Sequence, residues 1–133
     1  MTLVAAAHLA SRQGSAHAQD VKVIRHAIVA DEPAARGGDD LGPSPFELVL
    51  AGLAACTSIT LQMYAGRKQW ALGQVRVDLR LSDDEGTMRV DRLIRFEAPL
   101  SDEQRARLLE IADKTPVTRA LKAGLTIETR LER

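Results

Sequence analysis

The stretch that decides the fold runs from Ser44 to Cys56 and reads Ser-Pro-Phe-Glu-Leu-Val-Leu-Ala-Gly-Leu-Ala-Ala-Cys. Ser44 is suited to cap a helix, Pro45 to occupy its first position, and Glu47 to complete a capping box. The residues that follow are apolar on every side, and a helix of that kind must be buried. The sequence therefore predicts a long buried helix over residues 45–67, with Cys56 midway along it.

Two properties of this helix bear on the whole molecule. Its apolar run ends at Thr57 and Ser58, below the roughly 18 to 20 residues that cross a bilayer, so we expect no membrane partner. A helix that is apolar all round needs cover on all sides, and a chain of this length provides little of it. A second copy of the chain is the simplest source of that cover, and an obligate homodimer is expected.

Composition and charge limit the functions that are open to the chain. Its 133 residues predict a single domain over residues 1–133 with its own core. Lys and Arg total 18, as do Asp and Glu, and the two signs are interleaved, which argues against nucleic-acid binding. One cysteine excludes an intrachain disulfide, and the three histidines lack the spacing of a metal site. No positive charge precedes the mildly apolar N-terminal stretch, which favours a cytoplasmic protein over an exported one.

Strands are predicted on both sides of the helix. Residues 21–30 are rich in β-branched side chains and should form one strand, with residues 3–9 as a weaker strand that pairs with it. Residues 75–81 alternate strictly between apolar and polar, and residues 87–96 return as the second arm of a hairpin. The inward face of that arm should carry Met88, Val90, Ile94 and Phe96. Arg92 falls on the same face, as an irregularity in the pattern.

The C-terminal third predicts two helices and a closing strand. Ser101 and Gln104 form a second capping box, which opens a helix whose apolar side holds Leu108, Leu109, Ile111 and Ala112. Thr115 and the proline after it open a short helix that Gly124 ends. Residues 125–131 alternate again and should form the last strand. The predicted order is β-β-α-β-β-α-α-β, an α+β fold.

Longer motifs of the chain resemble those of a known family. The segment Gly37–Thr57 is similar to the loop-and-helix signature of the OsmC/Ohr family, which comprises osmotically inducible protein C and the organic hydroperoxide resistance proteins. Ala30–Pro33 and Leu108–Val117 stand where the flanking motifs of the family stand. The resemblance implies an OsmC-like intertwined homodimer with active sites at the subunit interface. It also implies thiol-dependent reduction of organic hydroperoxides without a cofactor.

The resemblance places Cys56 at the peroxidatic position of the family, where a thiolate attacks the peroxide and becomes a sulfenic acid. On the residues alone, a thiol in an apolar helix is more often an inert small hydrophobe, unless a cation comes close to it. Thr115 occupies the position of the second cysteine, so the disulfide of the two-cysteine cycle cannot form within one subunit. A helix cap is the structural alternative for Thr115.

The family also uses an arginine and a glutamate to hold the thiolate. Arg12, in the segment Ser11–Gly14, resembles the N-terminal turn that carries the arginine, and Arg25 is the alternative; either could also be a solvated charge at a strand end. The glutamate position of the family is held here by Phe46, and Glu47 follows one residue later. Glu47 is therefore either a catalytic acid or only the capping-box residue.

Two functions fit these expectations. The first is a one-cysteine, peroxiredoxin-like reductase in oxidative-stress defence, which takes a small organic hydroperoxide and an external thiol or dithiol reductant. It predicts a positive group beside the sulfur, and a substrate site that includes Phe46, His26 and Thr115. His26 could equally be an ordinary strand histidine. The second is a non-catalytic OsmC-like dimer that keeps an inert thiol and binds a small molecule at the subunit interface.

Overall fold

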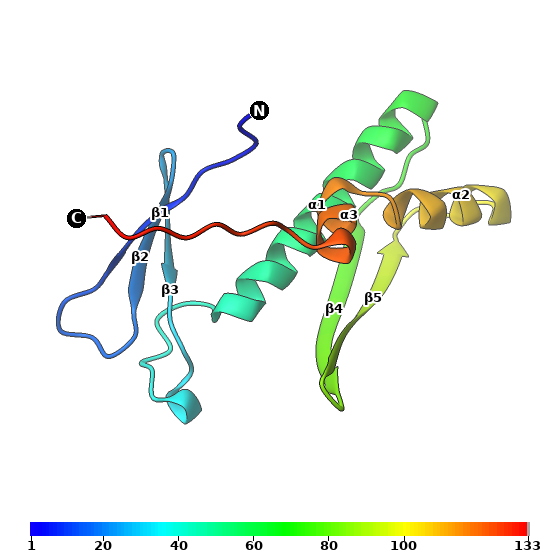
Figure 1. The fold of residues 1–133 in the computed structure, drawn as a ribbon. Helices are drawn as coiled ribbons and strands as arrows, with labels where there is room; N and C mark the ends of the chain where they lie inside the picture. Colours follow the sequence, from blue (N-terminus) through cyan, green and yellow to red (C-terminus); the bar gives the residue numbers. More distant parts are fainter. Residues whose placement is uncertain (133) are drawn as a thin grey trace. The chain divides into compact units, whose positions relative to one another are not determined.

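The computed structural model describes residues 1–132. The chain divides into two compact units, Met1–Val49 and Leu50–Arg133. The first unit holds strands β1 (His8–Ser11), β2 (Gln19–Val23) and β3 (His26–Ala30) and the short 3-10 helix η1 (Ala34–Arg36). Helix α1 (Pro45–Lys68) begins in the first unit and continues into the second, where it is followed by β4 (Val75–Asp84), β5 (Thr87–Phe96), α2 (Asp102–Ala112) and α3 (Pro116–Ala123) (Figure 1). The chain is an α+β fold with one long helix, whose observed bounds confirm the predicted helix to within a residue.

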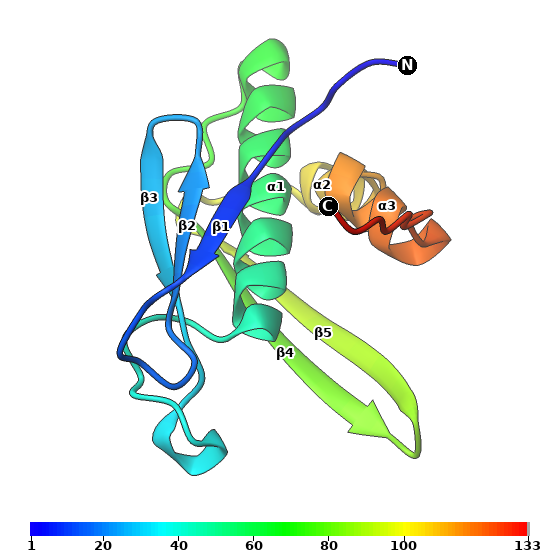
Figure 2. The ribbon, with the colours of Figure 1, turned by 60° about the vertical axis from the view of Figure 1, so that its left-hand side comes forward.

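The N-terminal unit contains an antiparallel sheet in the order β1-β2-β3 (Figure 2). The prediction of one strand over residues 21–30 is wrong, because the chain turns at Ile24 and Arg25 and Val23 pairs with His26. Ile24 adopts a φ of 56°, which β-branched residues rarely do, so the sequence carries no turn signal there. The weaker strand expected over residues 3–9 forms only from His8 onward.

The β4–β5 hairpin confirms the second strand prediction. Asp84 pairs with Thr87, and the two residues between them, Glu85 and Gly86, both have a positive φ, as a tight hairpin turn requires. Apolar residues of β4 are half-buried in strict alternation with exposed ones. The inward set predicted for β5 is only partly correct: Ile94 and Phe96 pack on the core, whereas Met88 and Val90 remain exposed near the tip of the hairpin.

Both C-terminal helices form where their caps predict. The Ser101 hydroxyl accepts from the Gln104 backbone N–H and the Gln104 side chain accepts from the Ser101 N–H, so the capping box is complete. Leu108 and Ala112 are buried as expected, but Leu109 is 64% exposed and does not belong to the core. Helix α3 begins at Pro116, and Gly124, with a φ of 83°, follows its last residue.

The closing strand predicted over residues 125–131 does not form. No strand is assigned to this segment, and its apolar side chains, Leu125, Ile127 and Leu131, are exposed. A strand needs a partner for its backbone N–H and C=O groups, and none of the described strands pairs with this segment. The predicted element order is therefore wrong at both ends: a third strand precedes α1, and α3 is the last element.

Helix α1 is buried along a single stripe rather than on all sides. Its fully buried residues are spaced four apart: Leu53, Thr57, Leu61 and Ala65. Leu61 and Ala65 form a core with Leu72, Leu108 and Ala112. Other apolar positions of α1 stay open, with Ile59 and Met63 54% and 58% exposed. The helix also runs for 24 residues and is long and apolar enough to cross a membrane by length and composition, which corrects the expectation that it is too short.

Candidate functional site

The Cys56 sulfur lies beside the N-terminus of a second helix. Cys56 is half-buried on α1, and its Sγ accepts the backbone N–H of Val117 at 3.5 Å, across 61 residues of sequence. Val117 is the second residue of α3, so its N–H is one of those that the helix leaves without an internal partner. Such N–H groups and the helix dipole favour a negative charge, which is the thiolate form of the sulfur. The other neighbour within reach is the Thr60 hydroxyl, at 3.9 Å.

A largely buried arginine lies next to this contact. Nη1 of Arg92, on β5, donates to the Thr57 hydroxyl and to the Thr118 hydroxyl, both at 2.9 Å. Its Nη2 donates to the carbonyl of Ala112 at 3.0 Å and lies 3.6 Å from the Asp113 carboxylate. The Arg92 side chain is only 13% exposed, whereas that of Asp113 is 63% exposed. We call these five residues the Arg92 network; they join one strand to parts of α1, α2 and α3.

The network continues to Thr115, at the start of α3. Thr115 is at the N-cap position, as predicted, but its hydroxyl makes no bond to the backbone of the helix. Instead its oxygen lies 2.6 Å from that of Thr118, and both side chains are buried. Because Arg92 donates to Thr118, the Thr118 hydroxyl keeps its own proton for another acceptor, and Thr115 is in reach. The predicted capping role of Thr115 is thus replaced by a bond between two hydroxyls.

A hollow of about 530 Å³ opens beside the Arg92 network, within the Leu50–Arg133 unit. Its walls are mainly apolar and are formed by Leu53, Met88, Val90, Ile94, Leu109 and Leu121. Its polar groups include Arg92, Asp113 and Lys122. Apolar walls with a few charged groups are typical of sites for small organic molecules.

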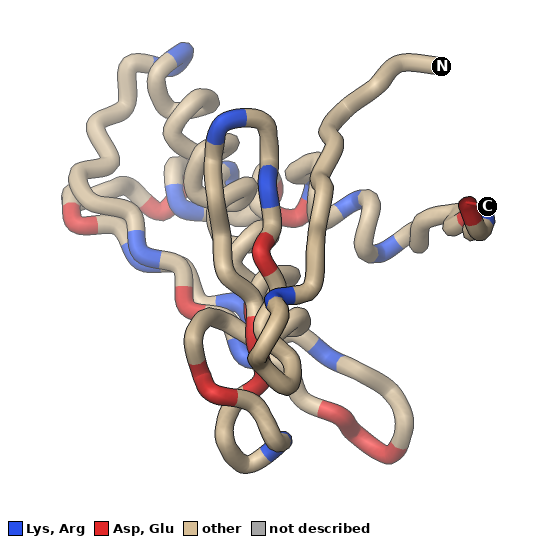
Figure 3. The backbone as a smooth tube through the Cα atoms, turned by 90° about the vertical axis from the view of Figure 1, so that its left-hand side faces the viewer, with Lys and Arg blue, Asp and Glu red and all other residues tan. Residues whose placement is uncertain are grey.

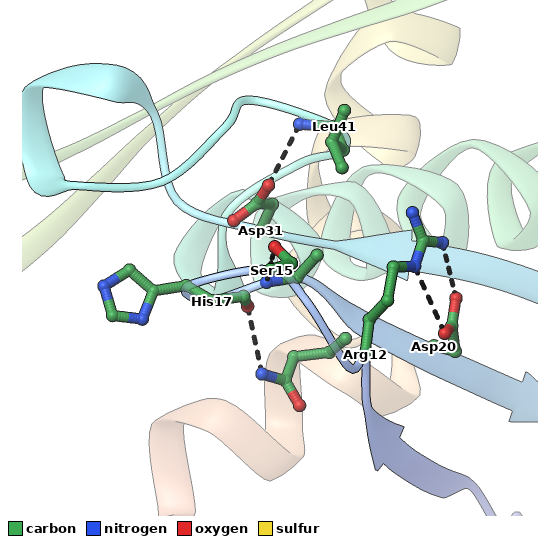
Figure 4. Close-up of polar contacts among 8 residues, drawn as sticks. Arg12, Ser15, His17, Asp20, Asp31 and Leu41 are labelled. Carbon is green, nitrogen blue, oxygen red and sulfur yellow. Dashed lines mark hydrogen bonds and ion pairs between the residues drawn. The ribbon is translucent and has the colours of Figure 1, made fainter.

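Arg12 is held in an ion pair within the N-terminal unit. Its Nη2 lies 2.6 Å from Asp20 Oδ1, and its Nε donates to Asp20 Oδ2 at 3.3 Å (Figure 4). These hydrogen bonds lower the pKa of Asp20 and raise that of Arg12. Arg25, the alternative arginine, is not on a strand but in the exposed turn between β2 and β3, and His26 is the exposed first residue of β3. The catalytic and substrate-binding roles of these residues stay predictions.

Glu47 makes the contact of a capping-box acid. Its Oε1 accepts the backbone N–H of Ser44 at 2.8 Å, and this hydrogen bond lowers the pKa of the Glu47 carboxyl. Phe46, the residue before Glu47, is exposed. The cap therefore uses the carboxylate of Glu47, and a role toward the sulfur stays a prediction.

The loop that leads into α1 is organised by a buried carboxylate, Asp31. It accepts backbone N–H groups from Glu32 at 2.7 Å and Asp39 at 3.3 Å. A third comes from Leu41 at 3.2 Å (Figure 4). Burial raises the pKa of Asp31, but the three N–H donors and the nearby His17 outweigh it, so the pKa is lowered overall. The charged form of Asp31 thus holds together the segment that carries the helix cap.

Lysine and arginine are interspersed with aspartate and glutamate along much of the backbone, and neither sign gathers into one stripe (Figure 3). Among residues 1–132, no three histidine, cysteine, aspartate or glutamate side chains gather in a way that could hold a metal ion.

Sequence reasoning did not foresee the Val117 N–H at the Cys56 sulfur or the Arg92 network beside that contact. The Arg92 signal was present, because a charged residue interrupts the apolar face of β5. The Val117 N–H could not be found from the sequence, since a backbone donor carries no side-chain signature and comes from a distant element.

Comparison with known proteins connects this arrangement to a family. A family model described as "OsmC-like protein" matches residues 37–130, while a search of curated sequences finds no match. The solved structure of an OsmC-like protein from Mycoplasma pneumoniae is similar with a TM-score of 0.77 and 18% identity, over 92% of this chain and 89% of that one. A Psychrobacter arcticus protein described as a putative osmotic stress induced and detoxification response protein gives a TM-score of 0.76 and 18% identity, over 90% of each chain. The organic hydroperoxide resistance protein OhrB of Bacillus subtilis gives 0.62 and 22%, over 90% and 91%.

Proposed function

The chain belongs to the OsmC-like family, and from this premise we propose that it is a one-cysteine reductase of organic hydroperoxides. Several structurally similar proteins are described as organic hydroperoxide resistance proteins. The observation that carries the proposal is the hydrogen bond from the Val117 N–H to the Cys56 sulfur. It gives a thiol on an apolar helix a hydrogen-bond donor that can stabilise the thiolate.

The proposed reaction has two parts. The Cys56 thiolate attacks the outer oxygen of the hydroperoxide, the O–O bond breaks, and the leaving alkoxide takes a proton to become an alcohol. The sulfur is left as a sulfenic acid. One thiol of an external dithiol then attacks that sulfur and releases water. The second thiol of the reductant attacks the mixed disulfide, which frees Cys56 and leaves the reductant oxidised. Thr115 takes no covalent part, because a hydroxyl forms no disulfide.

The other expected residues complete the proposal. Arg12 or Arg25, together with Glu47, would hold and polarise the thiolate, and Phe46, His26 and Thr115 would contact the organic part of the peroxide. We place the protein in the cytoplasm, where thiol reductants are available.

We also propose that the protein acts as a homodimer. The exposed apolar positions of α1, with Ile59 and Met63 among them, and the unpaired segment after α3 support a partner of the same sequence. Both features leave apolar or hydrogen-bonding surface that a single chain does not cover.

Turnover of a small organic hydroperoxide tests the proposal. Wild-type protein, Cys56→Ser and, as a control at an exposed position of the same helix, Gln62→Ala would be assayed with tert-butyl hydroperoxide and dithiothreitol, by loss of peroxide. We expect turnover by the wild type and by Gln62→Ala, and none above background by Cys56→Ser. Equal rates for the wild type and Cys56→Ser would rule the enzyme out.

The second candidate, a non-catalytic dimer that binds a small molecule, is favoured by Thr115 at the position of a resolving cysteine. The pH dependence of Cys56 alkylation separates the two. An activated sulfur should react with a midpoint below the roughly 8.5 of a free thiol, and a midpoint at or above that value would favour the binding protein.

A further inference from the structure

Arg92 connects the helix that carries Cys56 to the helix whose N-terminus faces its sulfur. On α1 it bonds to Thr57, the residue after Cys56, and on α3 to Thr118, the residue after Val117. Both bonds come from the same nitrogen and are 2.9 Å long. Cys56 and Val117, whose Sγ and N–H are in contact, are therefore each followed in the sequence by a threonine that bonds to the same Arg92 nitrogen.

The geometry of this link needs an arginine. The planar guanidinium presents donors in a fixed fork, and here one arm serves two hydroxyls while the other serves the Ala112 carbonyl at the end of α2. A buried charge destabilises a fold unless it is well hydrogen-bonded, and the neighbouring inward positions of β5, Ile94 and Phe96, are apolar. Packing alone would be served by a third apolar residue at position 92.

We propose that Arg92 is a positioning residue, which holds the N-terminus of α3 against the Cys56 sulfur and thereby sets the thiolate fraction of Cys56. The inference rests on the proposed function for its relevance to turnover, but it concerns a property of the thiol that is measured without a peroxide. Without the link, the Val117 N–H is free to move away from the sulfur, and the thiolate loses its helix-terminal partner.

The test compares the pH dependence of Cys56 alkylation by iodoacetamide in the wild type, Arg92→Met and Thr118→Val. Both variants should raise the pH midpoint of Cys56 alkylation by about half to one pH unit relative to the wild type. At a pH below both midpoints, the variants should therefore be alkylated roughly three- to tenfold more slowly than the wild type. Above both midpoints the rates should converge, which a change in access to the sulfur would not produce. Arg95→Met, an exposed arginine on the same strand, is the matched control and should keep the wild-type midpoint.

Thr118→Val separates positioning from simple charge, because it keeps the guanidinium and removes only the hydroxyl that ties α3 to it. It also decides the test if Arg92→Met does not fold. A folded Thr118→Val with the wild-type midpoint overturns the inference. Hydroperoxide turnover by the wild type is measured in parallel, and its failure would remove the proposed enzyme while leaving the difference in midpoint as a separate result.

Discussion

Two adjacent leucines on α2 allow a sharp test of the core. Leu108 is 1% exposed and packs with Leu61 and Ala65 of α1, whereas Leu109 is 64% exposed. Each would be changed to alanine, and because the helix propensities of leucine and alanine are close, the difference between the two variants reports burial alone.

The expected magnitudes follow from these exposures. Removing a buried leucine costs the transfer free energy of its side chain and a cavity term, so Leu108→Ala should lower the free energy of unfolding by about 3 kcal/mol. Leu109→Ala removes a side chain that is already about two-thirds in water and should cost about 1 kcal/mol or less. In a chain of this size, the first change corresponds to a fall in Tm of roughly 10 °C.

Urea denaturation followed by circular dichroism measures both variants, at one fixed protein concentration because association would add to the apparent stability. The wild type and both variants should unfold with similar m values. A Leu109→Ala variant that loses as much stability as Leu108→Ala would show that the assignment of core and surface on α2 is wrong.

Three further changes test local features of the fold. Ser101→Ala removes one half of the capping box of α2 and should cost about 1 kcal/mol in urea denaturation, whereas Ser82→Ala, at an exposed strand position, should be near neutral. Gly42→Ala places a Cβ against the Val29 carbonyl oxygen, closer than two such atoms can approach, and should lower Tm. Gly66→Ala, on exposed helix with open space around it, should raise Tm slightly; the opposite order would contradict the loop geometry. Asp31 has a lowered pKa in the folded chain, so its stabilising effect is present at neutral pH and is lost as the pH falls below about 4. Asp31→Asn should therefore be less stable than the wild type at neutral pH, and the gap should narrow on acidification; a constant gap between the two urea midpoints would contradict the charged role of Asp31.

The parts of the fold that were predictable carry local signals. Helix α1, the capping box at Ser101 and the β4–β5 hairpin depend on residues within a few positions of one another. The bounds of α1 agree with the prediction to within a residue, whereas β4 continues to Asp84, beyond its predicted end at residue 81. The hairpin between β2 and β3 was missed because Ile24 takes a positive φ without glycine or asparagine. The prediction of a closing strand was wrong for the opposite reason. Residues 125–131 do alternate between apolar and polar side chains, but no described strand pairs with them.

For the candidate site, the sequence singled out Cys56 and Thr115 but did not indicate which groups contact them. Which groups reach the sulfur depends on how α1, β5 and α3 pack, and such contacts between distant elements leave only indirect marks in a sequence. Arg92 was visible in the sequence as the one charged residue on the apolar face of β5. Its role could be inferred only from its hydrogen bonds to Thr57 and Thr118 in the structure.

The Thr115 hydroxyl, buried against Thr118, has a consequence for the lifetime of the oxidised enzyme in the proposed cycle. A resolving cysteine converts a sulfenic acid into a disulfide at once and so shelters it from a second peroxide molecule. With threonine in that place, the oxidised sulfur waits for an outside thiol, and during the wait more peroxide drives it toward the irreversible sulfinic acid. Resistance to inactivation would thus depend on the supply of reductant rather than on the protein itself.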